Sequence, residues 1–279
     1  MSEPGAGRVA GEESIGELLR DWRRRRRMSQ LDLAIEAEVS ARHISFVETG
    51  RARPSREMVM RLCEHLGVPL RQRNRMLIAA GYAPVYRERP VQAPEMEAVR
   101  QAMEKILSGH EPYPALVVDR TWNMVAANAG AAMLVEGMPE ELLREPINIM
   151  RLSLHPDGLA RRLVNLAEVR AHLLAGLRRQ ADASGDGGLA DLYEELVAYR
   201  YPDVDVNVTR LPGPGDILVP LRIRRGDAVL SMFTTIVTFG TPVDVTVAEL
   251  AIEMFWPSDE VTAAAFEPQH AAARSGDQG

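Results

Sequence analysis

Cysteine and long apolar runs are the scarcest features of this 279-residue sequence. Cys63 is the single cysteine, so no disulfide can form within the chain. Its place beside Leu62 and Leu66 on a helical pattern predicts a buried thiol rather than a redox sensor. No run reaches the roughly 18 apolar residues that a membrane-spanning helix needs, and the opening MSEPGAGRVAGEES has no apolar signal core. We therefore expect a cytoplasmic protein that does not contact a membrane.

The sequence also lacks the common signatures of catalysis and of metal binding. Its six histidines are scattered without metal-ligand spacing, and it has no GxGxxG loop, HExxH helix or glycine-flanked nucleophilic serine. His155 opens the segment HPDG, but the proline and glycine there are typical of a turn rather than of a general base. We predict no metal, no cofactor and no enzymatic activity, with an unrecognised hydrolase as the minor alternative.

Acidic residues outnumber basic residues in the whole sequence, but the two kinds are unevenly distributed. The net charge is −6, which by itself argues against nucleic-acid binding. Residues 1–80, however, carry 15 arginines against 11 acidic residues, whereas residues 81–279 carry 18 basic and 28 acidic residues. A basic N-terminal part and an acidic remainder suit a protein that contacts phosphates with one end only.

The most informative segment is residues 28–54, MSQLDLAIEAEVSARHISFVETGRARP. It predicts two short helices joined by a tight turn, because Ser29 and Ser40 can each cap a helix and apolar residues follow at helical spacing. The second helix buries Ile44 and Val47 and leaves a mixed surface outward: Arg42, His43, Ser45 and Phe46. This arrangement is typical of a DNA-reading helix-turn-helix.

Residues 14–80 resemble the Xre/Cro-like repressor family. Gln30 opens the first motif helix as in that family, and the second helix runs from a Ser40 cap to Glu48-Thr49-Gly50. The resemblance implies a phosphate contact for Gln30, an ion pair between Arg23 and Glu48, and base-reading positions at Ala41, Arg42, Ser45 and Phe46.

Among these positions, Arg42 is the best candidate for reading a base, because arginine can pair bidentately with guanine. We expect His43, Arg51 and Arg53 at the sugar-phosphate backbone. The sequence departs from the family at Glu38, where the turn usually has glycine. A non-glycine residue must therefore adopt a left-handed conformation there, at some energetic cost.

Helical patterns flank this motif and complete an all-α domain of about five helices over residues 14–80. The additional helices are predicted at 14–27, 55–66 and 69–80. Residues 81–94, GYAPVYRERPVQAP, are predicted to be a linker because of their prolines, and residues 1–13 are predicted to be disordered.

The pattern changes after the linker. A helix at 94–108 precedes two strands within 115–128, turning at Asp119-Arg120-Thr121, and then a helical block over 129–199. Further strands are predicted at 217–223, 228–239 and 245–256, with a hairpin turn at Arg225-Gly226-Asp227. The order indicates an α+β domain over 95–262, PAS-like, with about five antiparallel strands and a helical insertion. Residues 263–279 are predicted to be a disordered tail.

Residues 95–262 resemble the MmyB-like ligand-binding domain that follows Xre-type domains in bacterial regulators. The resemblance rests on the segments at 110–128, 147–165 and 238–260. It implies an apolar cavity that binds a fatty-acid-like molecule.

Candidate ligand-binding residues follow from these motifs and from the central strands: Trp122, Asn128, Asn148, Arg151, Phe233 and Phe239. Each has a structural alternative. Trp122 can be core, the two asparagines can cap the turns that follow them, and Arg151 can pair with a glutamate. Asp244 and Thr246 are predicted to form a structural corner.

These features together predict a one-component transcription regulator. We expect a homodimer on a near-palindromic double-stranded DNA operator, because one helix-turn-helix reads only a half-site, and an apolar small molecule as effector. The alternative is a constitutive DNA-binding protein whose C-terminal domain serves only dimerisation.

Overall fold

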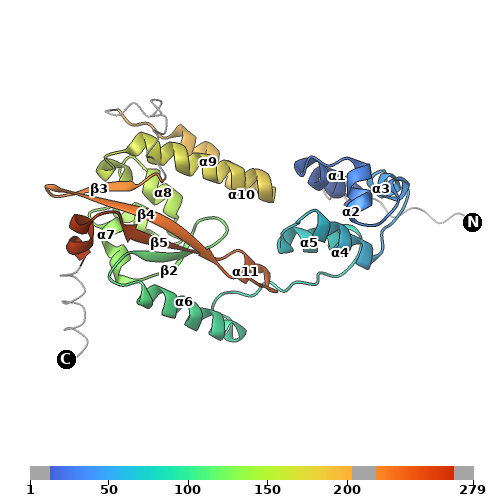
Figure 1. Cartoon of the computed structure of the whole chain (residues 1–279), viewed down its shortest axis with the longest axis horizontal. Helices are drawn as coiled ribbons and strands as arrows, with labels where there is room; N and C mark the ends of the chain where they lie inside the picture. The colour runs from blue at the N-terminus through green and yellow to red at the C-terminus, as the bar shows by residue number, and fades with distance from the viewer. Residues whose placement is uncertain (1–12, 203–217, 267–279) are drawn as a thin grey trace, which may run out of the picture. The chain divides into compact units, whose positions relative to one another are not determined.

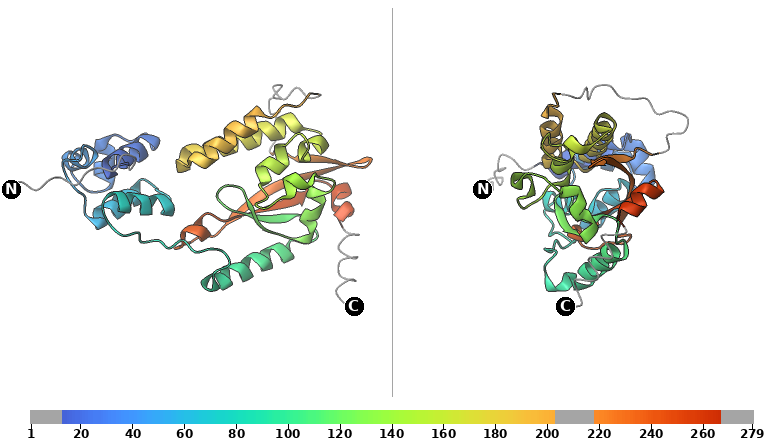
Figure 2. Two further views of the ribbon diagram at one scale, coloured as in Figure 1. Left: turned by 180° about the vertical axis from the view of Figure 1, so that it is seen from behind. Right: turned by 90° about the vertical axis from the view of Figure 1, so that its left-hand side faces the viewer.

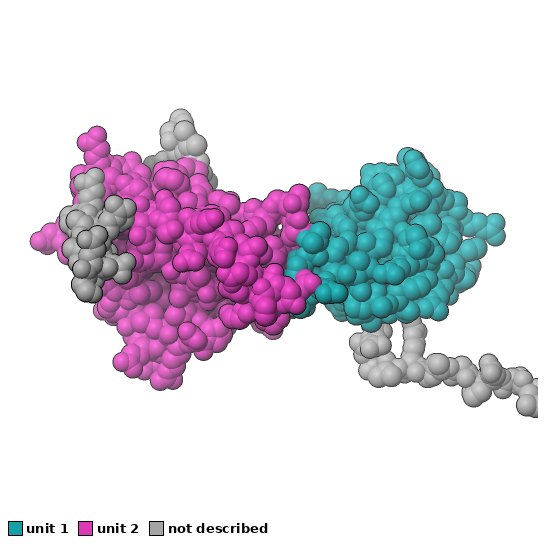
Figure 3. Space-filling model, turned by 90° about the horizontal axis from the view of Figure 1, so that it is seen from below, with its two compact units in different colours: residues 1–88, 243–245 teal, residues 89–242, 246–279 magenta. Residues whose placement is uncertain are grey.

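The computed structural model describes residues 13–202 and 218–266. The chain divides into two compact units, Met1–Glu88 with Val243–Val245, and Arg89–Pro242 with Thr246–Gly279 (Figure 3). The N-terminal segment predicted to be disordered lies outside the described residues except for Glu13. Residue 217, where a strand was predicted to begin, and the end of the tail from 267 onward also lie outside them.

The first unit is helical throughout its described elements, which confirms the predicted all-α domain of about five helices. Serine side chains accept backbone hydrogen bonds at the start of four helices, and the caps at Ser29 and Ser40 confirm the two that were predicted. The elements are α1 (Ile15–Arg25), α2 (Gln30–Glu36), α3 (Ala41–Glu48), α4 (Arg56–His65) and α5 (Leu70–Ala79).

The core of this unit is closely packed. Leu19, Leu33, Ile44 and Val47 have no exposed surface. Cys63 is equally buried, and burial raises the pKa of its thiol to about 12, so the predicted inert thiol is confirmed.

Helix α1 lies close to α3 at Gly16. A Cβ atom at Gly16 would lie 2.6 Å from the carbonyl oxygen of Val47 and 2.8 Å from that of Glu48. Only glycine permits this separation between the two helices.

The segment after α5 remains attached to that helix. The Asn74 side chain accepts from the backbone N–H groups of Val85 and Tyr86 and donates to the Tyr86 carbonyl, while Arg71 forms an ion pair with Glu88. The predicted linker thus begins with residues that are fixed against α5.

The second unit is built on an antiparallel sheet of five strands in the order β2-β1-β5-β4-β3. This sheet confirms the predicted strand number and direction. The strands are β1 (Ala115–Val118), β2 (Met124–Ala127), β3 (Leu221–Arg225), β4 (Ala228–Thr238) and β5 (Ala251–Pro257).

The prediction of one strand over 245–256 was wrong in its first half. Val245–Ala248 form the short helix α11, and β5 begins only at Ala251. Asp244 is buried at the corner before α11, and the backbone N–H of Val245 donates to the Arg87 carbonyl over 2.8 Å. The β-branched valines of VDVTV favour a strand locally, but this corner overrides them.

Helices cover both faces of the sheet (Figures 1 and 2). Helix α6 (Glu97–Gly109) packs on one face through Met103 and Leu107. The other face carries the helical insertion: α7 (Ala132–Val135), α8 (Ile149–Leu154), α9 (Leu166–Ser184), α10 (Gly187–Ala198) and the short turns η2 (Ala129–Ala131), η3 (Glu140–Leu143) and η4 (Leu159–Arg162). A further turn, η1 (Pro94–Met96), leads into α6.

Residues predicted to begin the disordered tail are instead folded. Residues 260–266 are helical, and Phe266 is 1% exposed, with its ring in edge contact with Tyr113. The alanine-rich composition of this segment favoured disorder, but the buried ring of Phe266 holds the segment against the second unit.

Candidate DNA-reading helix and ligand cavity

Helix α3 presents the candidate DNA-reading surface. Ser40 caps the helix by accepting the backbone N–H of His43. On the outward face, the Arg42 guanidinium lies 5.1 Å from the Phe46 ring centroid, and that of Arg51 lies 6.0 Å from the same ring. Phe46 therefore holds two exposed arginines close to one aromatic surface.

A buried carboxylate fixes α3 to the preceding helices. Glu48 accepts from Arg23 at 2.6 and 2.9 Å, so the predicted Arg23–Glu48 pair is present and bidentate. Burial opposes the charge of Glu48, but hydrogen bonds from Arg23 and Gln30 outweigh it and hold its pKa below the usual range. Arg20 adds a bond to the Glu48 carbonyl.

Two of the predicted phosphate contacts have internal partners in the structure. The Nε2 of Gln30 donates to Glu48 over 2.8 Å, and the Nε of Arg53 donates to the Ala80 carbonyl over 3.0 Å at the end of α5. Arg53 thus caps α5, a role that the sequence analysis did not assign to it. Arg51 remains exposed beside Phe46.

The remaining predicted DNA-contacting positions also lie on α3, and their side chains are accessible to solvent. Ala41, His43 and Ser45 are each partly exposed. The turn before α3 holds Glu38 at φ 52°, the left-handed conformation expected where the family has glycine.

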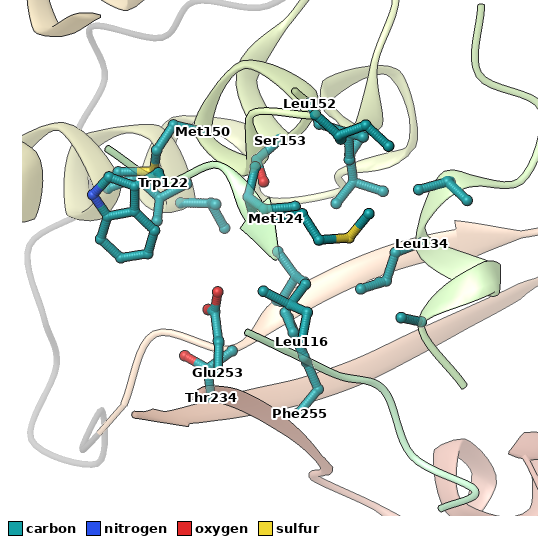
Figure 4. Close-up of a pocket in the computed structure, with 18 of the residues that line it drawn as sticks. Leu116, Trp122, Met124, Leu134, Met150, Leu152, Ser153, Thr234, Glu253 and Phe255 are labelled. Carbon is teal, nitrogen blue, oxygen red and sulfur yellow. The ribbon is translucent and has the colours of Figure 1, made fainter. Parts of the chain in front are cut away.

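The second unit contains an apolar cavity of about 90 Å³, enough for several water molecules in its present form. It lies between the inner face of the sheet and the helical insertion (Figure 4). Its apolar wall comes from Leu116 and Met124 on the strands, Leu134 and Leu152 on the helices, and Phe255 on β5.

Trp122, a candidate for the wall with core packing as its alternative, lines this cavity and also packs against the core of the second unit. It has φ 66°, unusual for a bulky residue, and its indole N–H donates to Gln180 on α9 over 2.8 Å. Backbone strain of this kind is tolerated where the surrounding structure fixes the residue. The turn before it is closed by Asp119, which accepts from the backbone N–H groups of Thr121 and Asn123.

The other ligand-binding candidates are not among the residues that line the cavity. Asn128 bonds the backbone of Ala115 and caps η2, and Asn148 caps α8 by accepting from the Arg151 N–H. Arg151 forms an ion pair with Glu195 at 2.7 Å. For these three residues the structural alternatives hold.

The two phenylalanine candidates are directed away from the cavity by strand alternation. Phe233 pairs with Trp256, whereas the neighbouring Thr234, which lines the cavity, points to the opposite face of β4. Phe239 packs with the cluster under α6. Aromatic content alone did not indicate which face each strand residue occupies.

Four polar residues of the cavity were missed by the sequence analysis: Ser153, His172, Thr234 and Glu253. A signal for one of them was present, because Glu253 is the single charged residue within the apolar strand AIEMFW. Glu253 lines the cavity, and Figure 4 shows its carboxylate directed inward. Burial raises the pKa of Glu253 to about 7.

Comparison with known families agrees with these two sites. Residues 99–268 match the MmyB-like transcription regulator ligand binding domain, and residues 14–76 match a helix-turn-helix domain. The chain belongs to the family of MmyB-like transcription regulators. No curated protein sequence gives a significant match to it.

The two matches define a transcription regulator with a DNA-binding domain and a ligand-binding domain, and not an enzyme. Within residues 13–202 and 218–266, no helix is both long and apolar enough to span a bilayer. Across the same residues, no group of three or more His, Cys, Asp or Glu side chains could hold a metal ion.

Proposed function

We propose that this protein is a one-component regulator that reads operator DNA with α3 and senses an apolar small molecule in the cavity of its second unit. The observation that carries the DNA half is the Arg42–Phe46–Arg51 cluster on the exposed face of a helix anchored by Glu48. The observation that carries the sensing half is the apolar cavity in the matched ligand-binding domain.

In the proposed complex, α3 enters the major groove with its N-terminal half toward the bases. Arg42 reads a guanine through its O6 and N7 atoms, and Phe46 contacts a neighbouring thymine methyl group. Arg51 contacts phosphate, so its contribution decreases as salt concentration rises. His43 and Ser45 lie at the edges of this surface, and Gln30 reaches the backbone if its amide leaves Glu48.

The DNA half is tested by selecting duplexes from a random library with the full-length protein and then measuring the affinity of variants for the selected site. Arg42→Ala is expected to cost about 1–3 kcal/mol and to relax specificity at one base pair. Arg51→Ala is expected to weaken all sequences alike and to reduce the salt slope by about one.

Arg61 provides the matched control, because it is an exposed arginine on α4 rather than on α3. Arg61→Ala should leave both affinity and specificity unchanged. If Arg42→Ala instead weakened binding to every sequence equally, Arg42 would be a phosphate contact, and the base-reading assignment would be wrong.

The sensing half requires that a ligand bind the DNA-competent and DNA-incompetent states with different affinity. We propose that the protein is a homodimer on a near-palindromic site, since two recognition helices are needed for useful specificity. The apolar walls suit an alkyl or aromatic body, including the chain of the fatty-acid-like molecule that the family resemblance implies.

The alternative is constitutive DNA binding with a second unit that serves only dimerisation. Native mass spectrometry of freshly purified protein, before and after organic extraction, distinguishes the two. A co-purifying small molecule whose removal changes DNA affinity supports sensing. An extracted and an untreated sample that bind DNA identically, with no bound molecule in either, would favour the alternative.

A further inference from the structure

Among the described residues, the cavity is lined by one carboxylate and by no arginine or lysine to balance it. Glu253 is its only acidic lining residue, and no arginine or lysine lines it among the described residues. The remaining polar side chains of the wall are Ser153, Thr234 and His172. The described residues therefore give the cavity a single acidic side chain in a mainly apolar wall.

Glu253 also lacks a partner among the residues that the structure describes. Its carboxylate receives no hydrogen bond and no ion pair from any residue in the described part of the chain, and desolvation by burial is the one effect acting on its pKa. Burying an ionised carboxylate without a partner is costly, so such groups are normally paired or protonated. A bound molecule could supply the missing partner.

The sheet fixes the direction of this side chain. Glu253 lies on the central strand β5, with Leu116 of β1 and Ile236 of β4 as its cross-strand neighbours. Thr234 lies diagonally beside it on the same face of β4, where its hydroxyl adds a second acceptor. Because β5 is hydrogen-bonded on both sides, the carboxylate is held on a rigid element that faces the cavity.

We propose that this cavity binds an apolar molecule that ends in a protonated amine, with the ammonium group paired to Glu253 and the apolar body against Leu116, Met124 and Phe255. The inference rests on the proposed sensing function and specifies its ligand class. An ammonium group donates three hydrogen bonds, which Glu253 and Thr234 can accept. The ion pair forms among mainly apolar side chains, where charge pairs are stronger than in water.

The same geometry disfavours a fatty acid. A carboxylate ligand would be repelled by the ionised form of Glu253, and the described lining residues offer no arginine fork to receive it. The apolar wall suits the chain of a fatty acid, but the lining does not suit its head group. The head group of the effector is thus expected to differ from the one that the family resemblance implied.

The test uses three probes of equal chain length, decylamine, decanol and decanoic acid, titrated calorimetrically into the full-length protein below their aggregation concentrations. Decylamine is expected to bind most tightly, decanol less tightly and decanoic acid least. Decanoic acid or decanol binding more tightly than decylamine would overturn the proposed head group while leaving an apolar sensing cavity in place.

Two variants assign the binding to Glu253. Glu253→Gln keeps the shape but removes the charge, and it should weaken decylamine binding by about thirtyfold or more and strengthen decanoic acid binding. Glu194→Gln removes an exposed acidic charge from α10 and should change neither affinity. Equal loss in both variants would show that decylamine binds the acidic surface, and would overturn the proposal.

Failure of the sensing function gives a different result from failure of this inference. If none of the three probes binds the wild-type protein, the apolar cavity is not a ligand site, and both proposals fall. If decylamine binds wild-type and Glu253→Gln proteins equally, only the role of Glu253 is refuted. Circular dichroism melting of each variant confirms that it is folded before its affinity is interpreted.

Discussion

Each unit contains a glutamate that faces protein atoms rather than bulk solvent, and the two glutamates differ in their hydrogen-bond partners. In the first unit, Glu48 is 4% exposed and accepts three side-chain hydrogen bonds, two from Arg23 and one from Gln30. In the second unit, Glu253 faces an apolar cavity and receives none from the described residues. Accordingly, the pKa of Glu48 is lowered and that of Glu253 is raised.

The difference indicates what each region does. The paired carboxylate locks α3 against α1 and α2, as a DNA-reading helix requires, because its geometry must be in place before binding. The unpaired carboxylate of Glu253 leaves a site that is stabilised when a bound molecule supplies a hydrogen-bond or ionic partner. Burial alone does not determine the state of a carboxyl group. The hydrogen-bond donors around a carboxyl group also determine whether it is ionised.

The largest expected effect comes from breaking the paired site. Glu48→Ala leaves the Arg23 guanidinium without its buried partner and should reduce the stability of the first unit by about 3–5 kcal/mol. Hydrogen-exchange mass spectrometry of the full chain would show faster exchange in peptides from α1 and α3. Because the folded-state pKa of Glu48 lies below its unfolded value, its contribution is present near neutral pH and is lost as pH falls through that folded-state pKa.

Glu36→Ala is the control for this prediction, since Glu36 is exposed on α2 and should change stability by less than about 0.5 kcal/mol. Similar exchange in the two variants would show that the Glu48 network does not stabilise the first unit.

The second prediction compares two substitutions that each add one carbon atom, one in each unit. Gly16→Ala places a Cβ atom against the Val47 and Glu48 carbonyls and should destabilise the first unit by about 1–3 kcal/mol. Val169→Ile extends into the cavity and should be neutral or stabilising by up to about 0.8 kcal/mol. Chemical denaturation of both variants measures the contrast, and a larger penalty for Val169→Ile would mean that the cavity is not open space.

The third prediction concerns pH. The pKa of Glu253 is raised from 4.5 to about 7, so the folded state retains a proton that the unfolded chain releases. Stability from this group is therefore complete below 4.5 and is lost as pH rises through about 7. Glu253→Gln removes this loss and should be more stable than wild type at mildly alkaline pH, by up to about 3 kcal/mol.

Thermal melts of both proteins across this pH window measure the difference. The two should converge at mildly acidic pH, where Glu253 is protonated. His172 also lines the cavity and is present in both proteins. A constant offset at every pH would contradict a titrating Glu253.

The smallest effect is expected at the turn of the DNA-reading motif. Glu38→Gly relieves a left-handed non-glycine residue but increases the freedom of the unfolded chain, so the net gain should be about 0.5–1 kcal/mol. Glu36→Gly, at the last residue of α2, should instead lose up to about 1 kcal/mol. Opposite signs for the two substitutions, measured by chemical denaturation, would confirm that the φ of Glu38 limits stability.

Prediction from the sequence succeeded where the signals were local. Serine caps, helical spacing and the glycine-replacing Glu38 each act within a few residues, so the helices of the first unit and the strained turn could be inferred directly. The number of strands and their antiparallel direction also followed from strand-like runs and turns. The strand order, the helix α11 in place of a strand and the anchoring of Phe266 did not, because they depend on contacts with distant segments.

The amino-acid sequence by itself determined that a helix-turn-helix precedes an α+β domain, and that Arg23 pairs with Glu48, because motif spacing and family resemblance fix these features. Only the tertiary structure decided which polar residues face the cavity. Asn128, Asn148 and Arg151 were drawn into caps and an ion pair, while Glu253 was left facing apolar walls. The physical reason is that a side chain's partners come from whichever elements the fold brings beside it, and residue type alone does not specify them.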